Sequence, residues 1–268
     1  MMEGTASLTA SFKEGHVEAD GFRIRYRECG QGHTVVILDS FTWGLSALHD
    51  SLARMYHVVA LELPGFGQSQ ANMTSRSVRE LASTAARATA SLVSEPYTLI
   101  GTSFAANVVL WQSLHVPDQV DALILISPTA LHPVAQSLTD TPQDAAKQLV
   151  AHAAHLTDWY AVEPTIFAKE QALVQRLQGD THDADAEHKL GDISCATLVV
   201  FGSKDRLVAP EAASLYRAKI PNCNVSIVYD TGHAILAERP EALISLVADY
   251  VEYRETFIVG RQSRMIHP

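Results

Sequence analysis

The stretch LIGTSFAA at positions 99–106 places a serine in a setting that suits a nucleophile. An apolar run leads into GTSFA at 101–105, a Gly-x-Ser-x-Ala pattern, and a helix is expected to begin directly after Ser103. A serine hydroxyl is a good nucleophile when a tight strand-to-helix turn projects it towards a base. The small residues on either side would let strand and helix pack closely, and the helix N-terminus would favour an oxyanion. A serine that only caps the helix is the alternative.

Two downstream segments supply partners for this serine. TLVVFGSKD at 197–205 predicts a buried strand, a glycine turn and then Asp205. VSIVYDTGH at 225–233 predicts another strand, with His233 in the loop that follows. Loops beyond the carboxyl ends of parallel strands form the ligand crevice of an open sheet. We therefore predict a catalytic triad in which His233 is the base for Ser103 and Asp205 orients the imidazole.

The elements that must position these residues follow a strand–helix rhythm. Residues 21–28 alternate apolar and charged side chains, which indicates a strand with one wet face. Apolar runs at 34–38, 57–61, 97–100, 122–126, 197–201 and 225–228 predict strands buried on both faces. Helical patterns at 77–94, 104–115, 211–219 and 241–252 lie between them. The fold class is α/β, a doubly wound and mostly parallel sheet with antiparallel pairing only at its start.

One long connection breaks this rhythm. No strand pattern occurs between Pro128 and Thr197, where amphipathic helices are expected at 149–155 and 166–177. Connections of that length in a compact domain are usually functional or form a small domain. We predict a core domain built from residues 1–128 and 195–268, with residues 129–194 inserted as a helical lid.

Composition excludes several classes of protein. Of 268 residues, 47% are hydrophobic and 19% are charged, as in a globular protein with a substantial core. The net charge of −10 and the lack of clustered Lys and Arg argue against a nucleic-acid partner. No apolar run approaches the roughly 20 residues of a membrane helix, and the first residues do not resemble a secretory signal. A soluble, cytoplasmic location without a membrane partner is expected.

Neither a cofactor nor a metal is expected. GFGQSQ at 65–70 lacks the third glycine of a dinucleotide loop. His152 and His155 lie one helical turn apart, without further ligands at matching spacing. The three cysteines are too few and too scattered for a disulfide framework. Near the end of the chain, FIV at 257–259 is apolar enough to pack on a sheet edge or on a second subunit, so a homo-oligomer is one alternative.

Together these motifs resemble the α/β-hydrolase superfamily, in its lidded esterase and carbon–carbon hydrolase type. The resemblance covers nearly the whole chain: ELPGFGQS at 62–69, GTSFA at 101–105, GSKD at 202–205, TGH at 231–233 and AERPE at 237–241. It implies an acyl-enzyme on Ser103, formed from a small-molecule substrate. It also implies an oxyanion hole made by the backbone N–H groups of Phe104 and Phe41.

The loop after the third predicted strand departs from that pattern. Relatives usually carry His-Gly here, whereas this chain has DSFTWG at 39–44. An ionised Asp39 at about 5 Å from the oxyanion, with an effective dielectric near 20, would repel it by about 3 kcal/mol. We expect Asp39 to turn away into a local hydrogen-bonded turn, with altered chemistry as the alternative. Trp43 either lines the acyl pocket or packs in the core, and both residues are candidates for substrate binding.

The predicted function is a serine hydrolase acting on a small or medium-sized ester, thioester or activated carbonyl compound. Two alternatives stay open. One is a carbon–carbon bond hydrolase that uses the same triad on a vinylogous diketone. The other is a ligand-binding receptor that keeps the triad and turns over slowly. The motifs identify a superfamily and do not specify a substrate.

Overall fold

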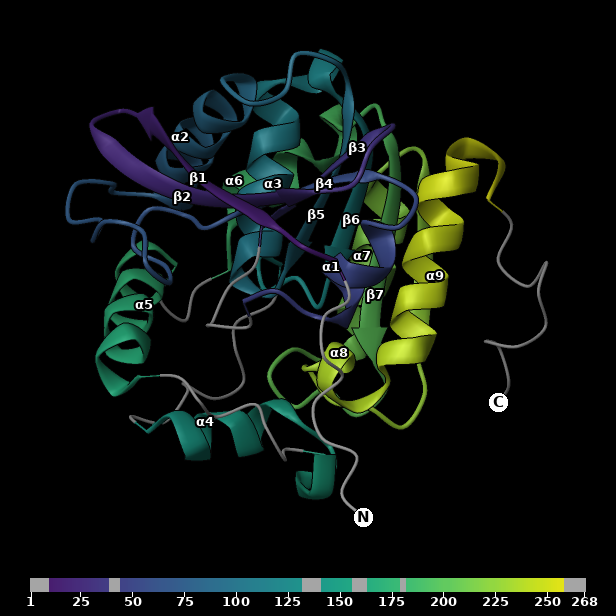
Figure 1. The fold of residues 1–268 in the computed structure, drawn as a ribbon. Helices are drawn as coiled ribbons and strands as arrows, with labels where there is room; N and C mark the ends of the chain where they lie inside the picture. The colour runs from purple at the N-terminus through teal and green to yellow at the C-terminus, as the bar shows by residue number, and fades with distance from the viewer. Residues whose placement is uncertain (1–9, 39–43, 132–140, 156–162, 179–181, 258–268) are drawn as a thin grey trace.

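The computed structural model describes residues 10–38, 44–131, 141–155, 163–178 and 182–257 (Figure 1). The strands of this part of the chain form one sheet in the order β1-β2-β4-β3-β5-β6-β7-β8. Strands β3 to β8 run parallel, whereas β2 pairs antiparallel with β1 and with β4. The predicted α/β fold, with antiparallel pairing only at its start, is confirmed. The strands are β1 (Lys13–Ala19), β2 (Phe22–Cys29), β3 (Thr34–Leu38), β4 (His57–Leu61), β5 (Tyr97–Thr102), β6 (Val120–Ile126), β7 (Ala196–Gly202) and β8 (Cys223–Val228).

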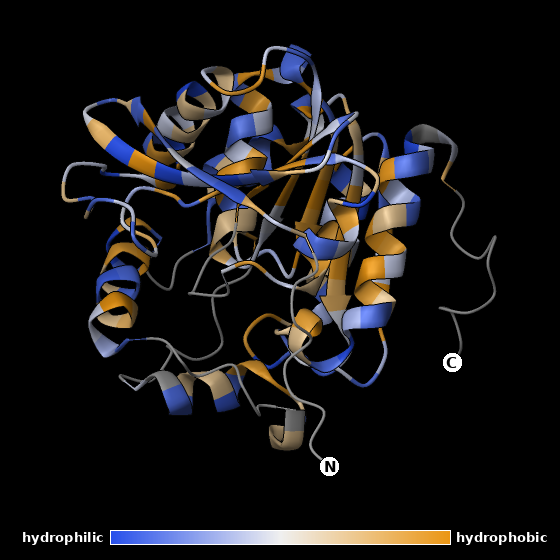
Figure 2. Ribbon diagram, viewed as in Figure 1, coloured by the Kyte–Doolittle hydropathy of each residue, from blue (hydrophilic) through white to orange (hydrophobic). Residues whose placement is uncertain are grey.

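The central strands are largely apolar because helices cover both faces of the sheet. On β3, Val36 and Leu38 belong to one hydrophobic layer, and Val35 and Ile37 belong to the other. All four side chains are at most 1% exposed. Figure 2 shows the hydrophobic residues of the central strands between the flanking helices. Alternation along a strand therefore supplies both layers of the core.

The helices divide between the two faces. Helices α2 (Val78–Ala90), α3 (Phe104–His115) and α7 (Ala213–Lys219) pack with the first layer. Helices α1 (Ala47–Leu52) and α9 (Pro240–Tyr253) pack with the second. At the end of α9, the Phe257 ring meets that of Tyr250 edge-on at 5.0 Å, so this part of the predicted C-terminal apolar stretch packs within the chain. Ile258 and Val259 lie outside the described residues.

The 129–194 segment contains three α-helices in its described part. They are α4 (Pro142–Leu149), α5 (Pro164–Leu177) and α6 (Ala184–Lys189). Helices α4 and α5 are set apart from the helices that flank the sheet, α4 on the side to which the arrow of β7 points (Figure 1). Their buried side chains Ala145, Phe167 and Leu173 nevertheless belong to the first hydrophobic layer. No strand occurs in the described residues of this segment. Its insertion as a lid remains a prediction.

The helix predicted at 149–155 is wrong. Helix α4 ends at Leu149, Val150 is extended with φ −113° and ψ 151°, and a short 3-10 turn follows at Ala153–His155. The backbone N–H groups of residues 151 and 152 donate to the carboxylate of Glu238, which lies 87 and 86 residues away in sequence, respectively. These long-range bonds replace the ones that a continuing helix would have made.

Candidate active site

Ser103 occupies a strained turn between β5 and α3. Its φ of 55° and ψ of −122° fall in a region that non-glycine residues rarely adopt. The turn is held by two backbone bonds, from the Ser103 N–H to the Ile126 carbonyl at 2.8 Å and from the Ala106 N–H to the Ser103 carbonyl at 3.0 Å. The side chain is therefore presented at the carboxyl end of the sheet, as predicted for a nucleophile elbow.

Gly101, two positions before Ser103, is required because β5 and α3 pack closely at this point. A Cβ atom at Gly101 would lie 2.5 Å from a methyl group of Val109 and 2.6 Å from the Ala105 carbonyl oxygen. Both neighbours belong to α3, so any larger residue would push the helix away from the strand. The glycine of the GTSFA stretch thus has a direct structural reason.

The three predicted side chains lie in one hydrogen-bonded row. His233, in the loop after β8, has its Nε2 atom 2.8 Å from the Ser103 hydroxyl oxygen. Its Nδ1 atom lies 2.8 Å from Oδ2 of Asp205, and both side chains of that pair are fully buried. For a neutral ring this geometry requires the tautomer with the proton on Nδ1, which leaves Nε2 free to accept.

Asp205 is held by its own loop as well as by His233. Its second carboxylate oxygen, Oδ1, accepts hydrogen bonds from the backbone N–H groups of Leu207 at 2.9 Å and Val208 at 3.0 Å. The carboxylate therefore has partners for both oxygens and a fixed plane. A fixed plane sets the orientation of the imidazole that it faces.

Sequence reasoning missed a further serine that holds the histidine loop. Ser127 directly follows β6, has φ 47°, and donates from its hydroxyl to the His233 carbonyl oxygen at 2.9 Å. Its backbone N–H donates to the Val200 carbonyl of β7 at 2.8 Å. Its position at the end of a predicted strand was the available signal, because that sheet edge also holds Ser103.

Gly202, at the end of β7, also lies close to the loop of His233. A Cβ atom at Gly202 would lie only 2.1 Å from the Gly232 carbonyl oxygen.

The predicted oxyanion and substrate residues are described only in part. Phe104 is 1% exposed, and its ring stacks on that of Phe66 with centroids 5.8 Å apart. Its N–H is the first of α3, and the first N–H groups of a helix have no acceptor within it. Asp39, Phe41 and Trp43 lie outside the described residues, so their predicted roles stay predictions.

Helix α5 is fixed to the loop that follows β4. Lys169 donates to the carbonyl oxygens of Gly67 at 2.8 Å and Ser69 at 3.2 Å. Glu170, beside it, accepts from the Gly67 N–H at 2.8 Å through Oε1. Its Oε2 atom is buried without a hydrogen-bond partner among the described residues. Burial raises the pKa of Glu170 to about 7, against the smaller opposing effects of the Gly67 bond and the Lys169 charge.

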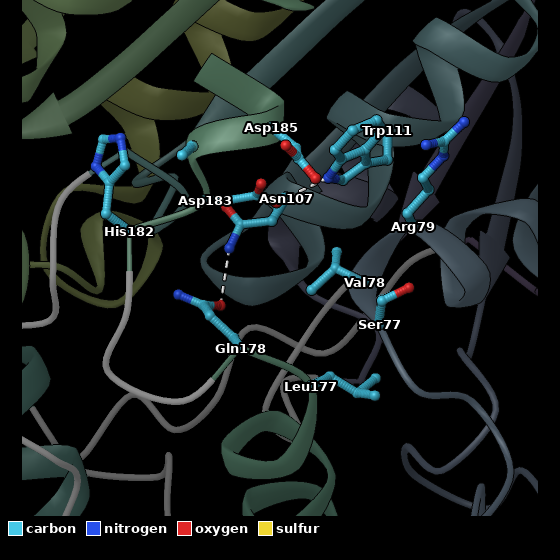
Figure 3. A pocket seen from close by; sticks show the side chains of 11 residues that line it. Ser77, Val78, Arg79, Asn107, Trp111, Leu177, Gln178, His182, Asp183 and Asp185 are labelled. Carbon is cyan, nitrogen blue, oxygen red and sulfur yellow. Dashed lines mark hydrogen bonds between the residues drawn. The ribbon is translucent and has the colours of Figure 1, made fainter. Parts of the chain in front are cut away.

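A cavity of about 420 Å³ lies between α2, α3, α5 and α6 (Figure 3). Asn107 donates to Gln178 Oε1 at 2.8 Å and Trp111 donates to Asp183 at 2.9 Å, which ties the 129–194 segment to α3. None of the three triad candidates lines it. The lining residues are Ser77, Val78, Arg79, Asn107, Trp111, Leu177, Gln178, His182, Asp183, Ala184 and Asp185.

Metal ligands are not grouped in the described part of the chain, which holds no cluster of three or more His, Cys, Asp or Glu residues suited to an ion. The imidazole of His152 instead pairs with Asp230 at 3.0 Å. Cys29, Cys195 and Cys223 are unpaired thiols. Among the helices that can be described, none has the length and apolar character needed to span a bilayer.

Comparison with known proteins identifies the family of this chain. The model of the alpha/beta hydrolase family matches residues 30–246, so the chain belongs to that family. A curated relative, 2-hydroxy-6-oxononadienedioate/2-hydroxy-6-oxononatrienedioate hydrolase 2 of Pseudomonas putida, is 25% identical over 94% of this chain and 98% of its own. The relative is a hydrolase by name.

Solved structures agree on the fold. A meta-cleavage product hydrolase from Pseudomonas fluorescens IP01 superposes with a TM-score of 0.75 at 17% identity, covering 89% of this chain and 97% of its own. A thermophilic esterase from Thermogutta terrifontis superposes with a TM-score of 0.72 at 17% identity, covering 91% of this chain and 100% of its own. The predicted α/β-hydrolase fold and membership of this superfamily are thus confirmed.

Proposed function

We propose that this chain is a serine hydrolase that cleaves a small or medium-sized ester, thioester or activated carbonyl compound through an acyl-enzyme. The observation that carries the proposal is the buried row from Ser103 through His233 to Asp205, with 2.8 Å at each step. A hydroxyl, an imidazole and a carboxylate in this order form the arrangement that activates serine in acyl transfer.

In the proposed reaction, Ser103 Oγ bonds to the carbonyl carbon while its proton passes to His233 Nε2. Asp205 stabilises the imidazolium that results, and the backbone N–H of Phe104 faces the oxyanion. The tetrahedral adduct collapses, and the leaving alkoxide or thiolate takes the proton from Nε2. His233 then removes a proton from water, whose oxygen attacks the acyl carbon to form a second tetrahedral adduct. As this adduct collapses, the bond between Ser103 Oγ and the acyl carbon breaks, Oγ takes the proton back from Nε2, and the acid is released. The second oxyanion donor would come from the 39–43 loop, with Phe41 as the candidate.

The 129–194 segment is proposed to act as a lid that shapes the substrate site. Its anchors support this placement, because α5 is bound to the loop after β4 and the residues after α4 lie against the loop of His233. A small-molecule substrate would then be enclosed between the segment and the carboxyl ends of the strands. Substrate selectivity would follow from the lid rather than from the triad.

A carbon–carbon bond hydrolase is the second candidate function. It is favoured by the similarity to the P. putida oxononadienedioate hydrolase over almost the full length of both chains. The same three side chains would serve, with a vinylogous diketone as the substrate.

Steady-state assays separate these candidates. The wild-type chain and Ser103→Ala are given a panel of p-nitrophenyl esters of increasing acyl length and, in parallel, a vinylogous diketone. Ester turnover that Ser103→Ala abolishes supports the proposal, whereas much faster cleavage of the diketone favours the second candidate. Turnover of neither class by a folded wild-type chain would contradict both and favour a ligand-binding receptor.

A further inference from the structure

A single buried carboxylate joins the loop of His233 to the segment after α4. Glu238 is the last residue of the short helix α8 (Ile235–Glu238) and is 5% exposed. Its Oε2 atom accepts from the Gly232 N–H at 2.6 Å and from the Thr231 hydroxyl at 3.1 Å. Both donors come immediately before His233 in the chain. The backbone that carries the imidazole is therefore bound to this carboxylate.

The same carboxylate binds a second stretch of backbone. Its Oε1 atom accepts from the His152 N–H at 2.8 Å, and the Ala151 N–H contacts both oxygens at 3.0 and 3.1 Å. These residues come shortly after α4 within the proposed lid. Donors from two distant parts of the chain thus converge on one side chain, and three of the four are backbone N–H groups, which can only donate.

The two stretches also meet on the other side of the histidine. The Ala234 N–H donates to the Leu149 carbonyl oxygen at 2.8 Å. At Gly232, an added Cβ atom would lie 2.7 Å from the Ala151 nitrogen and 2.9 Å from the Leu149 carbonyl oxygen. Residues 149–152 therefore contact the chain immediately before and immediately after His233.

We propose that Glu238 is a positioning residue that sets the placement of His233 and couples it to residues 149–152. This inference rests on the proposed function, in which His233 is the base. The carboxylate fixes the position of the Gly232 backbone, and the imidazole of the next residue reaches Ser103. A displacement of residues 149–152 is transmitted through Glu238 to Gly232, so the lid segment and the base move together.

The substitution Glu238→Gln tests the carboxylate with almost no change of shape. Glutamine replaces one acceptor oxygen with an NH₂ group, which would face backbone N–H groups that are also donors. At least one of the two stretches must then lose its acceptor. Glu241→Gln, at an exposed position three residues further on, removes the same charge and is the matched control.

The main measurement is active-site titration with a fluorophosphonate, which gives both the fraction of chains labelled and the rate at which they are labelled. For Glu238→Gln we expect labelling of essentially every chain at a rate lower by about tenfold or more, because small misplacements of a base slow its reaction steeply. The kcat for a short ester should fall in proportion, with KM nearly unchanged. Labelling at the wild-type rate, whatever fraction reacts, overturns the proposal, since it shows a structural role only.

Hydrogen exchange tests the coupling itself. In Glu238→Gln, peptides covering residues 149–152 and 231–234 should both lose protection, while Glu241→Gln leaves both unchanged. Loss confined to the 231–234 peptide would refute the coupling.

A second variant covers the case in which Glu238→Gln does not fold. Thr231→Val removes one donor to Oε2 of Glu238 with almost no change of shape. We expect every chain of this variant to be labelled, at a rate about threefold lower than that of the wild-type chain. Labelling at the wild-type rate would overturn the proposal here too. A wild-type chain that neither reacts with the probe nor cleaves esters would contradict the proposed function instead, so the two failures are distinct.

Discussion

Glu170 should make the stability of the fold depend on pH. Its carboxyl group is buried in α5, its Oε2 atom has no hydrogen-bond partner among the described residues, and burial raises its pKa to about 7 from a usual 4.5. Below pH 4.5 the group is protonated in both the folded and the unfolded chain, so it contributes nothing to the pH dependence of the free energy of unfolding. Between about pH 4.5 and 7 the unfolded chain loses this proton first, so the free energy of unfolding falls as pH rises.

The size of this effect follows from the difference between the two pKa values. Each pKa unit corresponds to about 1.4 kcal/mol, so ionised Glu170 costs about 3 kcal/mol above pH 7. Glu170→Gln keeps the acceptor for the Gly67 N–H and removes the ionisation. The variant should therefore match the wild-type chain near pH 4.5 and exceed its stability at pH 8 by about 1 to 3 kcal/mol.

Urea unfolding of both chains between pH 4.5 and 8 measures this difference directly. Glu95→Gln is the matched control, because Glu95 lies exposed in a loop and its replacement should leave the pH dependence unchanged. The reasoning is refuted if the wild-type chain and Glu170→Gln keep a constant difference across the whole range. It is equally refuted if the variant is the less stable protein at pH 8.

Three further substitutions concern the triad and its supports. Asp205→Asn should keep the fold and lower kcat by about 10⁴-fold, because the amide favours the wrong imidazole tautomer; an ester assay with a melting curve checks both. Gly202→Ala places a Cβ atom 2.1 Å from the Gly232 carbonyl oxygen and should cut ester turnover by about tenfold or more, and wild-type turnover would contradict this. Ser127→Ala removes the bond to the His233 carbonyl oxygen and should lower unfolding free energy by about 1 kcal/mol, measured in urea.

Local patterns were enough to predict the sheet and the candidate triad. The parallel strands are buried on both faces, so runs such as TVVIL at 34–38 are apolar without alternation and are easy to locate. Ser103, Asp205 and His233 each follow such a strand at its carboxyl end. Because parallel topology brings these ends together, sequence order and strand ends sufficed to predict that the three would meet.

Elements with few buried residues were harder to find. Strand β1, KEGHVEA, buries only Val17 and Ala19 and pairs at the sheet edge, so its sequence carries little strand signal. Helix α1 has only six residues and buries His49 and Asp50 beside its leucines, which masks its apolar face. In both cases tertiary contacts stabilise an element that local propensity does not specify.

The supports of the site depend on long-range partners that no local pattern reveals. Glu238 lies in AERPE at 237–241, a stretch that contributed only to the family resemblance, and its partners lie up to 87 residues away. Glu170 looked like an ordinary acidic residue of an amphipathic helix, yet it is fully buried against Gly67, 103 residues earlier. Charged residues are predicted to face solvent unless their partners are known.

Covalent labelling of Ser103 tests the central claim most directly. A fluorophosphonate should add one adduct per wild-type chain, mapped by peptide mass spectrometry to the peptide that contains residues 101–105. Ser103→Ala should show no adduct, and His233→Ala should react at least about 100-fold more slowly while remaining folded. An adduct on a different residue, or labelling of His233→Ala at the wild-type rate, would contradict the assignment of nucleophile and base.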